Sequence, residues 1–95
     1  MKVRNGWSIK FQKNVHMYCH RLVAEKGERQ YDVPCEDTPE EFVGVWLYGI
    51  GLDDAVLHDL LAGIVEWANS AGFPYRIYTA RDSYVTNEPS ARVDA

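Results

Sequence analysis

The sequence predicts an α+β fold in which two helices pack on one face of an antiparallel sheet, itself made of a three-strand meander and a C-terminal strand. Three observations lead to this prediction. Apolar and polar residues alternate through residues 7–35, which is typical of half-buried strands. Helical spacing and helix-capping residues dominate residues 37–72. Alternation then returns at residues 75–79.

The first predicted strand covers residues 6–12, where large apolar side chains alternate with polar ones. Lys13-Asn14 is the expected turn, because asparagine tolerates the left-handed conformation. The second strand is then expected at residues 15–23. In this register Tyr18 and His20 lie on the outer face of the sheet, away from the helices.

The remaining strands follow turn signals. A glycine-containing turn at residues 25–28 leads to a third strand at residues 30–35. After Pro74 the last strand is expected at residues 75–79, and a turn at residues 81–83 allows Val85 to extend it.

The first predicted helix has a capping box at its start. Thr38 caps the first turn, Pro39 occupies the first helical position, and Glu41 lies three residues after the cap. Gly49 is the expected helix stop. A buried strand is the alternative for residues 42–48, because the valines and glycine within this segment are poor helix formers.

The second predicted helix is capped by Asp53 and ends at Gly72 and Pro74. Its apolar residues recur at the helical period and define the face that packs on the sheet. With the strand faces they give the predicted core, which consists of Trp7, Ile9, Phe11, Val15, Met17, Tyr31, Val33, Phe42, Trp46, Leu57, Leu60, Leu61, Ile64 and Ile77.

Ninety-five residues predict one domain, expected at residues 1–86, followed by a mobile tail at residues 87–95 that carries few large apolar side chains. No apolar run approaches the roughly 20 residues of a membrane-spanning helix, and the N-terminus lacks the apolar core of a signal peptide. A cytoplasmic protein without membrane contact is therefore expected.

Charge is unevenly distributed along the chain. Residues 1–29 carry a net charge of +5, whereas residues 30–75 carry nine acidic residues and no lysine or arginine; the whole chain has a net charge of −4. Such an asymmetry produces a negative field that can steer a partner protein with a basic surface. The simpler interpretation is a solvated helical face that aids solubility.

The residue types that usually perform catalysis or bind metals are not arranged as a recognisable site in this sequence. His16, Cys19, His20 and Cys35 are potential zinc ligands, but residues four apart on a strand lie about 13 Å from each other, far beyond zinc bonds of about 2 Å. Neither cysteine has an activating environment that the sequence reveals. No cofactor, no metal and no enzymatic activity are therefore predicted.

Nucleic-acid binding is the second hypothesis to weigh. Lys10, Lys13 and Arg21 lie near aromatic residues on the N-terminal strands, and single-strand binders combine basic grooves with stacking aromatics. Direct nucleic-acid binding is not favoured, because the chain as a whole is acidic.

Arg76 and Tyr78 lie on the predicted outer face of the sheet. Exposed tyrosine and arginine side chains are typical anchors of protein interfaces.

The segment Asp37-Thr38-Pro39-Glu40-Glu41-Phe42, followed by Trp46-Leu47-Tyr48-Gly49, resembles small phage-encoded type I anti-CRISPR proteins. Some of these have a strand hairpin, a capped acidic helix that ends near a Trp-aromatic-Tyr-Gly run, and a second helix. The similarity covers residues 15–70, with Leu47 in place of an aromatic residue and one extra residue after the cap. The resemblance implies a non-enzymatic inhibitor in the cytoplasm of the bacterial host cell, which docks on a CRISPR surveillance complex or its nuclease and blocks target DNA binding or cleavage.

Two surfaces are candidates for such docking. An acidic helical face that mimics DNA would use Asp37, Glu40, Glu41, Asp53, Asp54, Asp59 and Glu66. A docking sheet face would use Tyr18, His20, Arg76 and Tyr78. The alternatives are a small phage assembly protein that forms a homodimer through a sheet edge, and a single-stranded nucleic-acid-binding domain.

Overall fold

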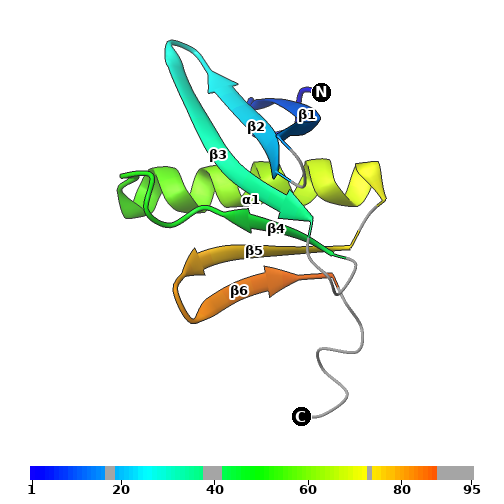
Figure 1. Cartoon of the computed structure of the whole chain (residues 1–95). Coiled ribbons are helices and arrows are strands. Elements are labelled where there is room, and N and C mark those ends of the chain that lie inside the picture. The colour runs from blue at the N-terminus through cyan, green and yellow to red at the C-terminus, as the bar shows by residue number, and fades with distance from the viewer. Residues whose placement is uncertain (17–18, 38–41, 73, 88–95) are drawn as a thin grey trace.

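The computed structural model describes residues 1–16, 19–37, 42–72 and 74–87, with only the backbone described for residues 14–16. The described chain forms a six-stranded sheet and one long helix (Figure 1). The elements are β1 (Ser8–His16), β2 (Cys19–Lys26), β3 (Arg29–Asp37), β4 (Val43–Trp46), α1 (Asp54–Ala71), β5 (Tyr75–Ala80) and β6 (Ser83–Thr86). The strands lie in the sheet in the order in which they follow along the chain.

The prediction of two helices on an antiparallel sheet is wrong, because the segment expected to form the first helix contains strand β4. Val43 and Val45 are β-branched, and β4 pairs with β3 on one side and β5 on the other. These contacts determine the conformation of residues 43–46. The predicted capping box, residues 38–41, lies outside the described residues.

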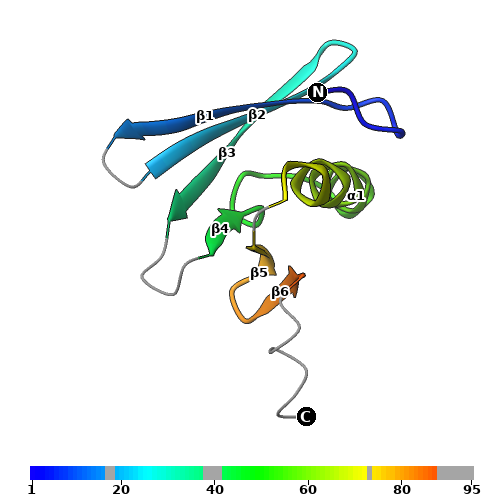
Figure 2. The ribbon, with the colours of Figure 1, turned by 90° about the vertical axis from the view of Figure 1, so that its right-hand side faces the viewer.

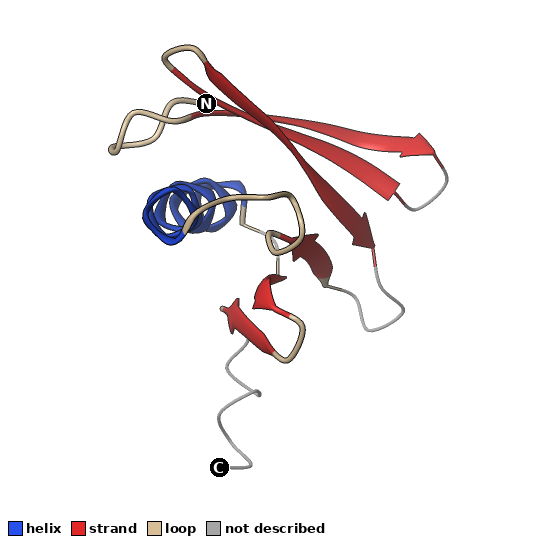
Figure 3. Cartoon of the chain, turned by 90° about the vertical axis from the view of Figure 1, so that its left-hand side faces the viewer, coloured by secondary structure: helices blue, strands red, loops and turns tan. Residues whose placement is uncertain are grey.

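The sheet is mixed. Strands β4 and β5 run parallel, because α1 connects the end of β4 to the beginning of β5 and so returns the chain to the end of the sheet where β4 began. All other neighbouring strands are antiparallel. Figures 2 and 3 show the sheet bent around α1, with β1–β3 on one side of the helix and β4–β6 on another. The face of the sheet toward α1 is called the inner face below, and the opposite one the outer face.

The register predicted for the second strand is also wrong. β1 continues through the predicted turn at residues 13–14 as far as His16, and β2 begins only at Cys19. The pairing of β1 with β2 is irregular between Gln12 and His16. A slip of one residue turns every side chain of a strand to the other face, so His20 is buried on the inner face and not exposed on the outer one.

The prediction for the second helix is confirmed. Asp53 caps α1, and its carboxylate accepts a hydrogen bond from the amide of Val56 at 2.9 Å. Gly72 ends the helix in the left-handed conformation, where its N–H donates to the carbonyl of Ala68. No helix in the described part of the chain is both long and apolar enough to cross a membrane.

The core lies between α1 and the inner face of the sheet. Predicted core residues that are buried there include Trp7, Ile9, Val33, Leu60, Ile64 and Ile77. The register error and the missed strand caused other core residues to be overlooked: Leu22, Ala24, Val45 and Leu47. Trp46, expected in the core, lies on the outer face because it follows Val45 on β4. Met17 and the side chain of Val15 lie outside the description.

The last strands agree with the prediction. β5 buries Tyr75 and Ile77 on one face, and Val85 lies on β6, which pairs with β5 after a turn. Of the tail predicted at residues 87–95, the structure describes only Asn87, whose side-chain oxygen accepts a hydrogen bond from the amide of Tyr75 at 3.1 Å.

Candidate functional site

The outer face of β4–β6 carries a group of aromatic side chains around one arginine. The strand register places Trp46 beside Tyr78, and Tyr78 beside Tyr84, so one aromatic residue from each strand forms a row across the sheet. Arg76 lies two residues before Tyr78 on the same face of β5. We call the following set the aromatic face: Phe42, Trp46, Arg76, Tyr78 and Tyr84.

These side chains contact one another directly. The rings of Trp46 and Tyr78 stack with their centroids 5.7 Å apart and an interplanar angle of 11°, and Tyr78 and Tyr84 meet at 5.3 Å and 54°. The guanidinium of Arg76 lies 4.1 Å from the ring centroid of Phe42 and 5.0 Å from that of Tyr84. Cation–π contacts of this kind hold the charged group over the rings.

Gly44 allows Trp46 to lie down on the sheet. A Cβ atom added at Gly44 would lie 2.7 Å from the Cη2 atom of Trp46 and 3.1 Å from its Cζ3 atom. The indole therefore occupies the space above the glycine backbone. Any larger residue at position 44 would displace the ring, so the sequence Gly44-Val45-Trp46 sets the shape of the aromatic face.

The aromatic face lies on the side of the sheet opposite α1. Here α1 lies on the inner face, whereas no described helix or strand lies over the outer face of β4–β6 (Figures 2 and 3). Trp46 and Tyr78 are half-buried by their neighbours, and Tyr84 is 42% exposed.

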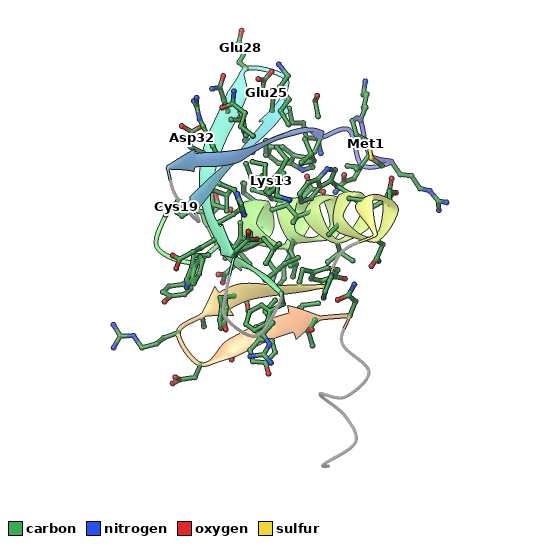
Figure 4. All side chains as sticks on the ribbon, turned by 45° about the vertical axis from the view of Figure 1, so that its right-hand side comes forward. Met1, Lys13, Cys19, Glu25, Glu28 and Asp32 are labelled. Carbon is green, nitrogen blue, oxygen red and sulfur yellow. The ribbon has the colours of Figure 1, made fainter. Side chains whose placement is uncertain are left out.

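The rest of the outer face, on β1–β3, has a different character. Its charges form pairs across neighbouring strands: Lys10 Nζ lies 3.6 Å from Glu25 Oε1, and Arg21 Nη2 lies 3.2 Å from Asp32 Oδ2. Figure 4 shows Glu25, Glu28 and Asp32 on the β2–β3 hairpin, away from Cys19 at the other end of β2. Two of the three basic residues considered for nucleic-acid binding, Lys10 and Arg21, are thus paired with acids.

Asp59, expected on an acidic helical face, instead connects three parts of the chain. Its carboxylate accepts hydrogen bonds from Trp7 Nε1 at 2.8 Å and from Lys26 Nζ at 2.7 Å. Asn5 Nδ2 donates to the backbone carbonyl of Asp59 at 2.6 Å. The hydrogen bond from Lys26, followed by that from Trp7, lowers the pKa of Asp59 below its usual value of 3.8. Asp59 therefore fixes the N-terminal segment on α1.

The other acids of the predicted acidic face do not form one surface. Glu66 accepts a hydrogen bond from the amide of Arg4 at 3.1 Å, and Asp37 contacts His20. Asp53 is used as the helix cap, and Asp54 is exposed in the first turn of α1. Glu40 and Glu41 lie outside the described residues, as does Tyr18 of the predicted sheet face.

His20, Cys35 and Asp37 come together on the inner face, a grouping that the sequence did not predict. His20 lies directly opposite Cys35 on β3, and its Nε2 atom is 2.8 Å from Asp37 Oδ1. The ring of Phe11 covers the histidine, with a centroid distance of 5.1 Å. These residue types can form a nucleophile, a base and an orienting acid.

The geometry closes this grouping to a substrate. The side chain of His20 is fully buried, and Cys35 is 2% exposed with its thiol directed to the carbonyl of Val33 at 3.5 Å. Burial raises the pKa of Cys35 to about 12, so the thiol is neutral at physiological pH. Cys19, the other cysteine, is exposed and forms no disulfide. No group of three His, Cys, Asp or Glu side chains arranged for a metal occurs within the described residues.

Comparisons with protein-family models, with curated proteins and with solved structures find no match for this chain. The candidate site is therefore defined by its own geometry. Arg76 and Tyr78 were predicted for the docking sheet face and lie in the aromatic face. Trp46 was missed because the prediction assigned it to the core, and Tyr84 was assigned to neither face of the sheet. Phe42 was also predicted for the core, and it is buried, with 5% of its surface exposed.

Proposed function

We propose that this chain is a non-enzymatic protein-binding module that docks on its partner through the aromatic face of β4–β6. The observation that carries the proposal is the group of contacting aromatic side chains on the outer face of β4–β6, which no described helix or strand covers. Tyrosine, tryptophan and arginine are the residues that contribute most to binding in protein interfaces. All three types are present here.

The arrangement favours a protein partner over a nucleic acid. In proteins that bind single strands, nucleobases stack on aromatic rings beside a basic groove that follows the phosphates. Here the guanidinium of Arg76 already lies on the rings of Phe42 and Tyr84. Basic side chains on the outer face of β1–β3 are paired with acidic ones. The chain also has a net charge of −4. A half-apolar protein surface fits this face better than a polyanion.

The sheet face is also favoured over the DNA-mimicking acidic face. Asp59, Glu66 and Asp37 have partners within the chain, which fix their positions for folding and reduce the charge available to a basic partner. Asp53 and Asp54 remain exposed at one end of α1. Two neighbouring carboxylates do not reproduce the spacing of a phosphate backbone over several nucleotides.

The proposed partner is a CRISPR surveillance complex, with inhibition of its DNA binding or of its nuclease as the consequence of docking. The similarity of the segment 37–49 to type I anti-CRISPR proteins suggests this partner. Since residues 43–46 form a strand and not the end of a helix, the aromatic face supports docking, and the resemblance supports only the choice of partner.

The experiment measures binding of the chain to a purified type I surveillance complex by biolayer interferometry. The wild type is compared with Tyr78→Ser, which removes the central ring of the row, and with the matched control Lys10→Ser on the outer face of β1. We expect the wild type and Lys10→Ser to bind alike. Removal of a central anchor costs about 2 kcal/mol or more, so Tyr78→Ser should weaken binding at least about 30-fold.

Each outcome decides between the parts of the proposal. Equal binding of all three proteins would exclude the aromatic face as the docking surface. No binding of the wild type at concentrations up to about 100 µM would exclude the surveillance complex as the partner. Far-UV circular dichroism of Tyr78→Ser verifies that the sheet is retained before binding is compared.

A further inference from the structure

Strand β6 is the last strand of the sheet, and no other described strand pairs with its outer edge. It is short, but its residues, Ser83–Thr86, include neither a charge nor a proline to protect the edge. The opposite edge strand, β1, carries Lys10 and Lys13, both exposed. Lysines on an edge strand oppose pairing with another chain, and their absence leaves β6 able to pair.

The exposed apolar side chains concentrate on this same strand. Among the described residues, the large hydrophobic side chains that are exposed are Met1, Tyr84 at 42% and Val85 at 37%. Tyr84 and Val85 are consecutive, so they project from opposite faces of β6. The edge is therefore apolar on both of its faces.

The backbone of Tyr84 is directed to the open edge. The carbonyl of Tyr78 accepts the amide of Leu47 at 2.9 Å, which places this carbonyl on the β4 side of β5. Because neighbouring residues of a strand alternate in direction, Ile77 turns toward β6 and exchanges hydrogen bonds with Val85, its register partner. On β6 the alternation then turns the N–H and C=O of Tyr84 away from β5.

We propose that a second copy of this chain pairs with β6 in antiparallel orientation about a twofold axis at Tyr84. The N–H of each Tyr84 would donate to the carbonyl of the other, as in any hydrogen-bonded antiparallel pair. The row Trp46–Tyr78–Tyr84 would then meet its own copy, and the two aromatic faces would become one continuous surface. The second copy thus completes the face.

The chemistry of the edge fits a second copy. β6 is uncharged, so two copies do not repel each other, and the aromatic residues that meet at the axis form a favourable cross-strand pair. In this register Asp82 comes opposite Thr86 of the second copy and Ser83 comes opposite Val85, so no two like charges face each other directly.

The pairing is expected to be weak. Four residues of strand span about 13 Å, and an interface of this length buries less than the roughly 1,200 Å² of a stable complex. A dissociation constant between about 1 µM and 1 mM corresponds to such interfaces. Self-association should therefore depend on concentration within this range.

Sedimentation equilibrium of the full chain, from about 5 µM to about 1 mM, tests the proposal. The wild type should change from monomer to dimer. Tyr84→Lys places two like charges at the axis and should weaken the dimer at least about tenfold. The matched control Gln12→Lys adds the same charge to the other edge strand and should dimerise like the wild type. A wild type that stays monomeric throughout, or equal effects of the two variants, would overturn the proposal.

A second variant tests the register. In a Cys19→Ser background, Tyr84→Cys should form an intermolecular disulfide on mild oxidation, because Cα atoms of a hydrogen-bonded pair lie about 5.5 Å apart, within disulfide range. Gln12→Cys in the same background should not form one. If Gln12→Cys cross-links as readily as Tyr84→Cys, the axis is not at Tyr84. Self-association is measured without the proposed partner, so its failure leaves the docking proposal standing, and the reverse also holds.

Discussion

Gly44→Ala tests the aromatic face without removing any of its side chains. The added methyl group would lie 2.7 Å from the indole of Trp46, a distance that real Cβ atoms do not show. The backbone at position 44 needs no unusual conformation, since Gly44 is not among the glycines with positive φ. The indole must therefore move, and its stack on Tyr78, now at 5.7 Å, should be lost.

The change in stability should be small because two effects oppose each other. Replacing glycine by alanine within a strand stabilises it by about 0.5–1 kcal/mol. Loss of the Trp46–Tyr78 pair costs about 0.5–1.5 kcal/mol. The free energy of unfolding of Gly44→Ala should thus lie within about 1 kcal/mol of that of the wild type.

Urea denaturation and tryptophan fluorescence together measure both expectations. The emission of Gly44→Ala should shift to longer wavelength as the indole gains solvent. Trp46→Phe identifies the contribution of this residue among the three tryptophans. An unchanged emission would show that the indole does not lie over Gly44. Destabilisation by about 3 kcal/mol or more would show that Trp46 is part of the core and not of a docking face.

Three further predictions concern the inner part of the molecule. Because the pKa of Asp59 is lowered on folding, its carboxylate stabilises the protein above the usual pKa of 3.8, and this contribution is lost as the pH falls toward the folded-state pKa. In urea denaturation from pH 7 to about pH 2, the free energy of unfolding of Asp59→Asn should therefore fall less than that of the wild type. An equal acid loss would contradict the contacts with Lys26 and Trp7. Gly63→Ala adds a Cβ atom 3.2 Å from atoms of Val3, Asn5 and Trp7. The cost of overpacking, about 1–3 kcal/mol, should exceed the gain in helix propensity of about 1 kcal/mol, so the melting temperature should fall. A rise in the melting temperature would show that the N-terminal segment can move away from α1. With a thiol reagent at pH 8, the native protein should react at Cys19 and not at Cys35, whose pKa is about 12, and unfolding should expose the second thiol; reaction of native Cys19→Ser would contradict this.

Local signals were sufficient for the elements whose ends the sequence marks. Asp53 and Gly72 mark the two ends of a helix that has a single apolar face, and both residues cap this helix in the structure. The alternation on β5 likewise placed Tyr75 and Ile77 on one face, and that face is buried. In these segments local preference and tertiary packing favour the same conformation.

The errors arose where long-range pairing decides the structure. Residues 43–46 form a strand because β3 and β5 hydrogen-bond to them on both sides, and these strands lie far apart in the sequence. β1 continues past the predicted turn as far as His16, and in the resulting register β2 buries His20 and exposes Cys19. An alternation pattern alone cannot reveal such a shift.

The candidate site was only partly predictable for the same reason. Arg76 and Tyr78 follow from the alternation on β5 and could be assigned to an outer face. Trp46 joins them only because β4 pairs parallel to β5, which depends on the crossover through α1. The acids of α1 appeared to form a charged surface, but Asp59 contacts Lys26, a residue 33 positions away in the chain.

Docking through the aromatic face is tested most directly by a comparative pull-down from the lysate of a bacterium with a type I CRISPR system. Tagged wild type, Lys10→Ser and Tyr78→Ser are used side by side at low and at high salt. We predict that surveillance-complex subunits are recovered in stoichiometric amounts with the wild type and Lys10→Ser, that Tyr78→Ser loses them, and that high salt does not release them, because the contact is largely apolar. Recovery that is equal for Tyr78→Ser, or that is lost at high salt for all three proteins, would contradict docking through this face.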